Sequence, residues 1–257
     1  MIKAILNGCN GKMGQVITQI CGEDAQIELV AGVDVFDREG NGYPVFANIS
    51  SCDVPADVII DFSNAKAVDD LLVYAADKRI PVVLCTTGLS KEQLARVTET
   101  AAKTAVLKSA NMSLGINLLL QLLGQAAAVL APAGFDIEIV EKHHNQKLDA
   151  PSGTALALAD AVNEVFDGDY EYKYDRSGER RKREKREIGI SAVRGGSIVG
   201  QHEVLFAGLD EVITFEHTAY SRSVFAKGAV EAAKFLAGKP AGLYDMQDVI
   251  AETQRTE

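Results

Sequence analysis

The stretch KAILNGCNGKMG, residues 3–14, decides which fold is predicted for the beginning of this chain. Residues 3–7 form a short apolar run typical of a buried strand, and a helical pattern follows the turn. The turn holds Gly8, Gly11 and Gly14, with the spacing G-x-x-G-x-x-G. Glycine permits a tight turn and close approach of the backbone to a pyrophosphate, and a helix start offers N–H groups to an anion. Glycine-rich turns are common, so the prediction of a dinucleotide site depends on the sequence around it.

An acidic residue, Asp34, ends the second predicted strand and supports this interpretation. It follows Gly14 by about 20 residues, where a carboxylate can accept hydrogen bonds from an adenosine ribose. The alternative is an ordinary strand-end turn residue. Val35 comes next rather than an arginine, which favours NADH over NADPH. The preference is weak, because Lys12 or Arg38 could reach a 2′-phosphate.

Strand and helix patterns alternate through the first 110 residues, as in a parallel sheet built from β-α-β units. The sequence therefore predicts a Rossmann-like dinucleotide-binding domain in an α/β fold. Thr86-Thr87 ends a strand on the side where a nicotinamide would lie, and Asn111 follows the next strand. The predicted strands are 3–7, 28–34, 56–63, 81–87 and 104–109, and the helices are 13–21, 65–78 and one opened by a Ser90–Gln93 capping box.

A second domain is predicted after an apolar helix at residues 114–130. Residues 135–144 alternate apolar and polar side chains, as a half-buried strand does. A further helix follows, and then three β segments, EIGISAVRG, SIVGQHEVLFAG and DEVITFEHTAY. We expect a smaller α+β domain with a mixed or antiparallel sheet over 114–222. Residues 1–113 and 223–257 are expected to form the dinucleotide-binding domain, with the C-terminal helix packed back onto it.

The net charge of −10 favours solubility and disfavours a general affinity for nucleic acid or anionic membrane. The apolar run near residues 114–130 raises the alternative of a membrane helix. Asn117, Gln121 and Gln125 interrupt this run, which favours a buried helix. The four cysteines are widely spaced, as reduced thiols of a cytosolic protein are. We therefore expect a soluble cytoplasmic protein with no nucleic-acid partner and no membrane partner.

One dense charge block, DRSGERRKREKRE at residues 175–187, contains seven basic and four acidic residues. Such blocks are usually solvated loops or helices, and this is the interpretation we favour. A role near an anionic ligand or at a subunit edge stays open. Nucleic-acid binding fits poorly with the acidic chain as a whole.

The stretch from Glu141 to Ala155, EKHHNQKLDAPSGTA, groups side chains suited to acid–base chemistry. It holds two of the four histidines and a Ser-Gly-Thr turn that opens a helix. A carboxylate could dock on the N–H groups of Gly153 and Thr154, with Lys147 as a point charge. A histidine can donate a proton to a reduced, carbanion-like intermediate near neutral pH. The pattern predicts a site for a small anionic substrate; the alternative is polar residues at a strand end before an ordinary helix start.

These motifs resemble the dihydrodipicolinate reductase family, the 4-hydroxy-tetrahydrodipicolinate reductases of lysine and diaminopimelate biosynthesis. HHNQKLDAPSGTA is similar to the family's substrate motif, and NGCNGKMG, TTG, EIGISAVRGGSIVGQHEVLFAG and GLYDMQDV occur in the family's order. The resemblance covers nearly the whole chain. It implies reduction of 4-hydroxy-tetrahydrodipicolinate to tetrahydrodipicolinate by hydride transfer from NADH or NADPH. It also implies a homotetramer joined through the sheet of the C-terminal domain.

The resemblance further implies roles for individual residues. His143 matches the family's proton donor or acceptor, and Lys147 matches its cationic partner, so these two are the expected catalytic residues. No metal is expected. The expected substrate-binding residues are His144, Ser152, Gly153 and Thr154. The expected cofactor-binding residues are Gly8, Cys9, Asn10, Gly11, Lys12, Met13, Asp34, Cys85, Thr86, Thr87, Ser109, Ala110, Asn111 and Met112.

Two departures from the family pattern concern the cofactor. Cys85 stands where the family usually has glycine, which puts the packing of the nicotinamide in doubt. Val35 replaces an arginine that often follows the ribose-binding acid, which puts recognition of a 2′-phosphate in doubt. Two other functions compete with the reductase: a semialdehyde dehydrogenase with Cys85 as nucleophile, and an NADH-sensing module without chemistry. The first lacks a histidine near Cys85 in the sequence, and the second would not need His143 and Lys147 together.

Overall fold

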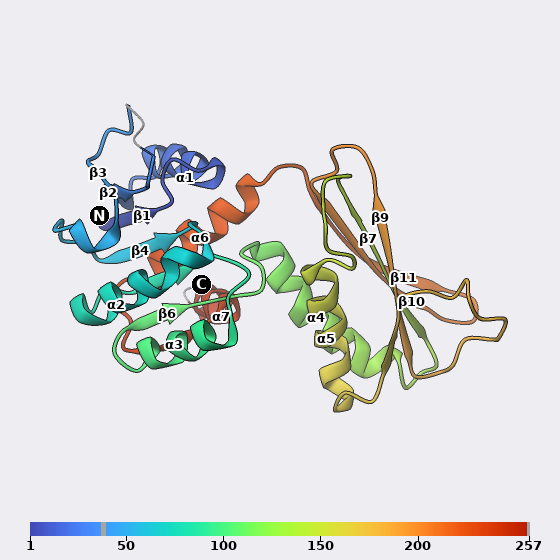
Figure 1. Ribbon diagram of the computed structural model, residues 1–257. Helices are drawn as coiled ribbons and strands as arrows, with labels where there is room; N and C mark the ends of the chain where they lie inside the picture. Colours follow the sequence, from blue (N-terminus) through green and yellow to red (C-terminus); the bar gives the residue numbers. More distant parts are fainter. Residues whose placement is uncertain (37–39, 256–257) are drawn as a thin grey trace. The chain divides into compact units, whose positions relative to one another are not determined.

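The structure, a computed structural model, describes residues 1–36 and 40–255, and the chain divides into two compact units (Figure 1). The first unit comprises Met1–Leu114 together with Ser223–Glu257, and the second comprises Gly115–Arg222. Each unit has its own sheet and its own buried apolar core.

The first unit contains a seven-stranded sheet in which all neighbouring strands are parallel. The strands are β1 (Ile2–Asn7), β2 (Ile27–Val33), β3 (Val45–Phe46), β4 (Val58–Asp61), β5 (Val82–Leu84), β6 (Ala105–Leu107) and β12 (Gly242–Tyr244). Their order is β12-β6-β5-β4-β1-β2-β3. The strand order reverses between β1 and β4, and open α/β sheets bind ligands beyond the carboxyl ends of the strands at such a point.

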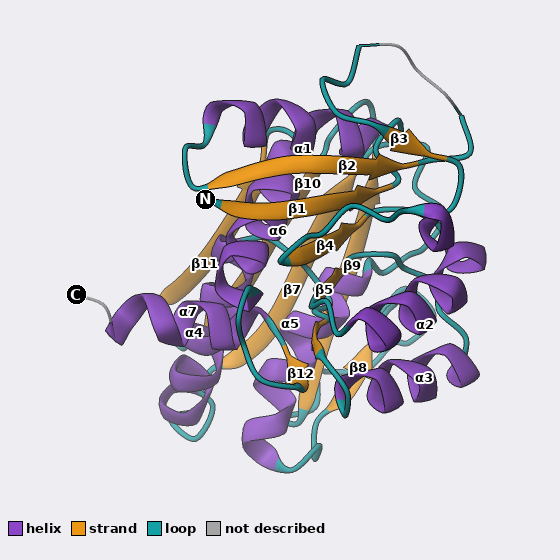
Figure 2. Cartoon of the chain, turned by 90° about the vertical axis from the view of Figure 1, so that its left-hand side faces the viewer, coloured by secondary structure: helices purple, strands orange, loops and turns teal. Residues whose placement is uncertain are grey.

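Helices cover both faces of this sheet (Figure 2). They are α1 (Lys12–Glu23), α2 (Val68–Lys78), α3 (Lys91–Ala101), α6 (Ser223–Leu236) and α7 (Met246–Arg255). The helices α1, α6 and α7 share one core with the sheet, and α2 and α3 share the other. The Ser90 hydroxyl accepts the N–H of Gln93 at 3.2 Å, and the Gln93 side chain accepts the N–H of Ser90 at 3.1 Å. This confirms the predicted capping box at the start of α3.

The second unit contains a five-stranded mixed sheet with the order β11-β10-β7-β9-β8. The strands are β7 (Asp136–His143), β8 (Glu171–Lys173), β9 (Glu187–Arg194), β10 (Gly200–Ala207) and β11 (Val212–Ala219). β7 is parallel to β9 and antiparallel to β10. The helices α4 (Leu114–Leu130) and α5 (Gly153–Asn163) share a core with β7, β9 and β10. Burial alternates along β7, so that Glu141 and His143 face the same side as the core residues Ile137 and Ile139.

The predicted fold class, a Rossmann-like unit with a smaller mixed-sheet unit, is confirmed. The sequence did not predict the short strands β3, β8 and β12, because their two or three residues do not belong to a longer apolar run, as those of β5 and β6 do. The sequence analysis also did not predict the last helix, α7, which follows Tyr244. Asp245 and Asp248 cap this helix reciprocally, each side chain accepting the other's backbone N–H, at 3.3 and 3.0 Å.

The apolar helix α4 is explained by burial within the second unit. Leu119, Leu123 and Ala127 are buried at helical spacing and belong to the core of that unit. In the described ranges, 1–36 and 40–255, no helix is both long enough and apolar enough to cross a bilayer.

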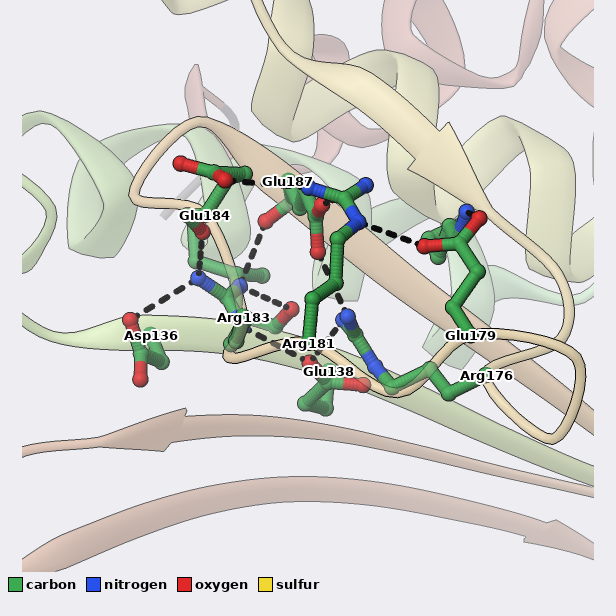
Figure 3. A network of polar contacts seen from close by, with 10 residues as sticks. Asp136, Glu138, Arg176, Glu179, Arg181, Arg183, Glu184 and Glu187 are labelled. Atoms are coloured by element: carbon green, nitrogen blue, oxygen red, sulfur yellow. Dashed lines mark hydrogen bonds and ion pairs between the residues drawn. The ribbon is translucent and has the colours of Figure 1, made fainter.

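The charge block at 175–187 forms a loop held to the sheet by a network of ion pairs (Figure 3). A loop was the favoured prediction for this block. Several of its arginines, however, pair with carboxylates instead of being fully solvated. The Glu187 carboxylate is buried beneath them, with only 2% of its side chain exposed. The pairs are Arg183–Asp136 (2.8 Å), Arg183–Glu138 (2.9 Å), Arg176–Glu138 (2.9 Å), Arg176–Glu187 (2.5 Å) and Arg181–Glu187 (3.2 Å).

Candidate active site

The glycine turn between β1 and α1 has no room for a side chain at two positions. Gly8 adopts a φ of +84°, and a Cβ there would lie 2.5 Å from the carbonyl oxygen of Phe62. A Cβ on Gly14 would lie 2.2 Å from the carbonyl oxygen of Gly8. Such close backbone packing is what a pyrophosphate-binding turn requires of its glycines.

The carboxylate of Asp34, directly after β2, is fixed over this turn. One oxygen accepts the N–H of Asn10 at 3.0 Å, and the other accepts the N–H of Phe36 at 3.1 Å. The Asn10 side chain donates to the Phe36 carbonyl and accepts from Asn41 at 2.8 Å. The turn and the acidic side chain are therefore held together, as binding of a ribose and a pyrophosphate requires.

A cavity of about 600 Å³ opens at this place. Of the expected cofactor residues, Gly8, Asn10, Gly11, Lys12 and Asp34 line it. Cys9 is completely buried, and Met13 packs against the apolar core, so their side chains do not line the cavity. Arg38, a candidate for contact with a 2′-phosphate, lies outside the described residues.

A buried carboxylate, Asp61, joins the strand ends next to this cavity. It has no exposed surface and accepts hydrogen bonds from the side chains of Asn7 at 2.8 Å, Ser63 at 2.6 Å and Thr86 at 2.6 Å. Burial raises the pKa of Asp61, and these hydrogen bonds oppose the increase. The expected cofactor residue Thr86 thus contacts a carboxylate that the sequence did not single out.

The remaining expected cofactor residues follow the neighbouring strands β5 and β6. Burial raises the pKa of the Cys85 thiol well above its usual value, with Asp61 adding to the effect. A protonated thiol is a poor nucleophile, which argues against the semialdehyde dehydrogenase alternative.

After β6, Asn111 accepts the N–H of Ser113 at 2.8 Å, and Met112 is buried. Thr87, Ser109 and Ala110 lie at the same carboxyl edge of the sheet.

In the second unit, His143 ends β7 and contacts Glu141. Its Nδ1 lies 2.6 Å from Glu141 Oε2, and Arg194 donates to both oxygens of Glu141 at 2.8 and 2.7 Å. Burial lowers the pKa of His143; Glu141 opposes this, and the charges of Lys147 and Arg194 add to it. The Glu141 carboxylate therefore favours the protonated form of this histidine, whereas burial and the two nearby cations favour the neutral form.

Ser152 caps α5 and connects it to a second buried histidine. Its hydroxyl accepts the N–H of Ala155 at 3.1 Å and lies 3.0 Å from His202 Nε2, while its N–H donates to Glu141 at 2.9 Å. His202 packs edge-on against His143, with 5.1 Å between the ring centroids. Ser152 therefore holds the turn through internal hydrogen bonds. Its expected direct contact with substrate stays a prediction.

The expected substrate-binding residue His144 and the expected catalytic residue Lys147 lie between β7 and α5. The Lys147 ammonium pairs with Asp149 at 2.8 Å, and the lysine side chain is 22% exposed. His144 Nδ1 is buried without a hydrogen-bond partner among the described residues. Gly153 and Thr154 form the first turn of α5, so their N–H groups stand at the positive end of the helix dipole. The second unit thus gathers a buried histidine, a cation and a helix start.

Sequence reasoning missed Asp61, Glu141, Arg194 and His202. Glu141 could have been found, because residues two apart on a strand share a face, and His143 follows it by two. Arg194 and His202 come from other strands, and only the register of the sheet places them beside Glu141. Asp61 ends a predicted strand, but its role depends on which strands are its neighbours.

Two family models together match nearly the whole chain. One, described as dihydrodipicolinate reductase, N-terminus, matches residues 2–112, and the other, dihydrodipicolinate reductase, C-terminus, matches residues 115–250. The break between the two matches coincides with the first boundary between the two units.

Curated relatives and a solved structure agree with these matches. A protein of Clostridium novyi (strain NT), named 4-hydroxy-tetrahydrodipicolinate reductase, is 53% identical over 250 residues, covering 97% of this chain and 98% of that protein. A protein of the same name from Caldanaerobacter subterraneus subsp. tengcongensis is 52% identical over 252 residues, covering 97% and 98%. The dipicolinate-bound dihydrodipicolinate reductase of Paenisporosarcina sp. TG-14 superposes with a TM-score of 0.78 at 27% identity, covering 96% of this chain and 99% of that chain.

Proposed function

Because the chain belongs to the dihydrodipicolinate reductase family, we propose that it reduces 4-hydroxy-tetrahydrodipicolinate to tetrahydrodipicolinate, a step of lysine and diaminopimelate biosynthesis. The observation that carries the proposal is the arrangement around His143. This buried histidine contacts the anionic Glu141, and the Lys147 cation and the start of α5 follow within the same motif. A cation and a helix start favour binding of a dicarboxylate, and a histidine can donate the proton that follows its reduction.

The residues around the glycine turn fit a nicotinamide dinucleotide. The positions that exclude a Cβ, Gly8 and Gly14, provide the tight turn and the close helix packing that a pyrophosphate-binding turn needs. Amides at the start of α1 would bind the pyrophosphate, and Asp34 would bind the adenosine ribose. When bound, the nicotinamide supplies a hydride. The dinucleotide would thus be held by residues of the first unit.

NADH is the proposed preferred cofactor, with NADPH as the second possibility. Among the described residues that line the cavity, Asp34 and Asp70 carry negative charges, and Lys12 carries the single positive charge. A 2′-phosphate would bring additional negative charge toward Asp34. Val35, beside that carboxylate, is 79% exposed and offers no charge to bind the phosphate.

The second unit supplies the groups that bind and protonate the substrate in this proposal. Lys147 offers a cation to a carboxylate, and the N–H groups of Gly153 and Thr154 offer a helix start to an anion. His144 is proposed as a further contact. His143 donates the proton that completes the reduction.

We also propose a homotetramer that assembles through the sheet of the second unit. The edge strand β11 exposes Val212 and Ile213, by 58% and 37%, and Leu209 before it is 97% exposed. Apolar side chains at a sheet edge favour contact with another chain. Light scattering on the purified protein should give the mass of four chains, and a monomer would contradict the proposal.

The experiment that tests the function is a reductase assay with freshly generated substrate and either nicotinamide cofactor. Oxidation of NADH that depends on substrate is expected. His143→Ala should lower kcat by roughly 10²- to 10⁴-fold, the contribution typical of a general acid. Thr154→Val should mainly raise KM for the substrate. Stoichiometric NADH binding without oxidation would support a sensing module instead, and full turnover by His143→Ala at saturating substrate would refute the role of His143.

A further inference from the structure

Glu141 contacts both the proton donor and the substrate-binding turn. Its carboxylate is completely buried. One oxygen lies 2.6 Å from His143 Nδ1, and the other accepts the N–H of Ser152 at 2.9 Å. Arg194 donates to both oxygens, and it also donates to the carbonyl of Asp149 at 2.6 Å. One buried anion therefore connects β7, β9 and the segment that leads into α5.

The charge on this carboxylate determines which nitrogen of His143 carries a proton. Burial alone would raise the pKa of Glu141, but hydrogen bonds from Arg194 and His143 outweigh it and lower the pKa below its usual value. An ionised carboxylate accepts hydrogen bonds and donates none, so Nδ1 of His143 carries a proton. The ring then gains and loses its other proton at Nε2. A Cβ on Gly200 would lie 3.1 Å from Nε2, so the glycine keeps that side of the ring uncrowded.

Building on the proposed function, we infer that Glu141 and Arg194 are positioning residues, which hold His143 with Nδ1 protonated and fix Ser152 at the substrate-binding turn through the same carboxylate. The groups that face His143 are Glu141 on its own strand, Arg194 from β9, His202 from β10 and Lys147 from the following segment. Of these, Glu141 is the anion. It favours the imidazolium form that donates a proton, whereas the two cations oppose it.

The test is Glu141→Gln, which keeps the volume and removes the charge. The glutamine oxygen can still accept the N–H of Ser152, so KM for substrate should change little. The glutamine NH₂ group faces His143 Nδ1 and can only donate, which moves the proton of the neutral ring to Nε2. We expect kcat to fall by roughly 10- to 100-fold, as for the loss of other groups that orient a functional histidine.

The pH profile gives a readout that general loss of stability would not produce. A general acid must be protonated, so kcat of the wild type declines as the pH rises through the pKa of His143. Glu141→Gln removes the anion that favours the imidazolium, so this decline should move to lower pH. Nitrogen-15 NMR of the imidazole reads the tautomer without turnover. It should report protonated Nδ1 in the wild type and protonated Nε2 in the variant, whether or not the reductase assay succeeds.

Glu187→Gln is the matched control. Glu187 is also a buried carboxylate paired with arginines in the same sheet, and its partners are Arg176 and Arg181. Its loss should affect stability without moving the pH profile or the tautomer of His143.

A second variant, Arg194→Lys, keeps the positive charge and loses the bidentate hydrogen bonds to Glu141. If Glu141→Gln does not fold, this variant should still show protonated Nδ1 and a smaller fall in kcat than His143→Ala. The inference is overturned if Glu141→Gln retains the wild-type pH profile and tautomer. It is also overturned if Glu187→Gln shifts them equally, or if Arg194→Lys shows protonated Nε2.

Discussion

The hydroxyl of Thr86 donates a hydrogen bond of 2.6 Å to the carboxylate of Asp61, which joins the carboxyl ends of β5 and β4. Thr86 has then used its one hydroxyl proton inside the protein, so it can contact a cofactor only as an acceptor or through its backbone. Asn7, at the end of β1, donates to the same carboxylate. The ends of three adjacent strands are therefore joined by one buried carboxyl group beside the glycine turn.

Asp61→Ala is expected to destabilise the first unit and to weaken NADH binding. The buried donors of Asn7 and Thr86 would lose their acceptor, at a cost of roughly 1–3 kcal/mol for each unsatisfied group. Asp61→Asn should cost less, because one acceptor oxygen remains. Urea denaturation and NADH titration measure the two effects. The control is Asp77→Ala on the exposed surface of α2, and an equal loss of stability in both alanine variants would contradict the role of Asp61.

Two glycines of α1 should respond oppositely to the same substitution. Gly14→Ala would place a Cβ 2.2 Å from a backbone oxygen, and such overpacking typically costs about 1–3 kcal/mol. A Cβ on Gly22 meets no atom within 4 Å, so Gly22→Ala should stabilise the helix by about 0.5–1 kcal/mol. Denaturation midpoints check both changes. Only Gly14→Ala should weaken NADH binding, and equal binding by the two variants would remove the basis for the pyrophosphate turn.

The sequence predicted those parts of the fold that depend on local patterns. Apolar runs separated by helical patterns predicted the long interior elements of both units, and Ser90 and Gln93 predicted a helix start. The two-residue strand β3 lies at an edge of the sheet, where few residues are paired and no period can be recognised. The sequence signal for α7 was the pair Asp245 and Asp248, which resembles a capping box with aspartate in place of glutamate.

The candidate site was predictable only where its residues are neighbours in the sequence. His143, Lys147 and the turn before α5 belong to one motif, so the chemistry they share could be inferred together. Arg194 reaches Glu141 because β9 runs parallel to β7 with Arg194 opposite His143. That pairing results from tertiary packing of strands about 50 residues apart, and no local pattern encodes it.

Val35→Arg is expected to shift the cofactor preference toward NADPH. The side chain at position 35 is 79% exposed beside Asp34, so an arginine fits without disturbing the core and offers a charged fork to a 2′-phosphate. The ratio of kcat/KM with NADPH to that with NADH should rise by about tenfold or more, which corresponds to roughly 1.4 kcal/mol of added binding. Val73→Arg, on the exposed face of α2 where the valine is 61% exposed, is the control and should leave the ratio unchanged. An unchanged ratio in Val35→Arg would place the ribose elsewhere.

His202 is expected to make the stability of the second unit dependent on pH. Burial, and next the charge of His143, lower the pKa of His202 from its usual 6.5 to about 4. His217 and Lys147 lower it further, and Glu141 opposes them. Between these two pKa values the unfolded chain binds a proton that the folded chain does not. Stability is therefore complete above about pH 6.5 and declines as the pH falls toward 4.

The loss attributable to His202 amounts to roughly 3 kcal/mol at most, since each pKa unit corresponds to about 1.4 kcal/mol. His202→Gln keeps a polar group beside Ser152 and cannot titrate, so its stability should decline less between about pH 7.5 and about pH 5. Urea midpoints of both proteins at the two pH values measure the difference. Part of the decline will persist in the variant, because burial also lowers the pKa of His143 and of His217. An identical decline in both proteins would mean that His202 does not titrate as its burial requires.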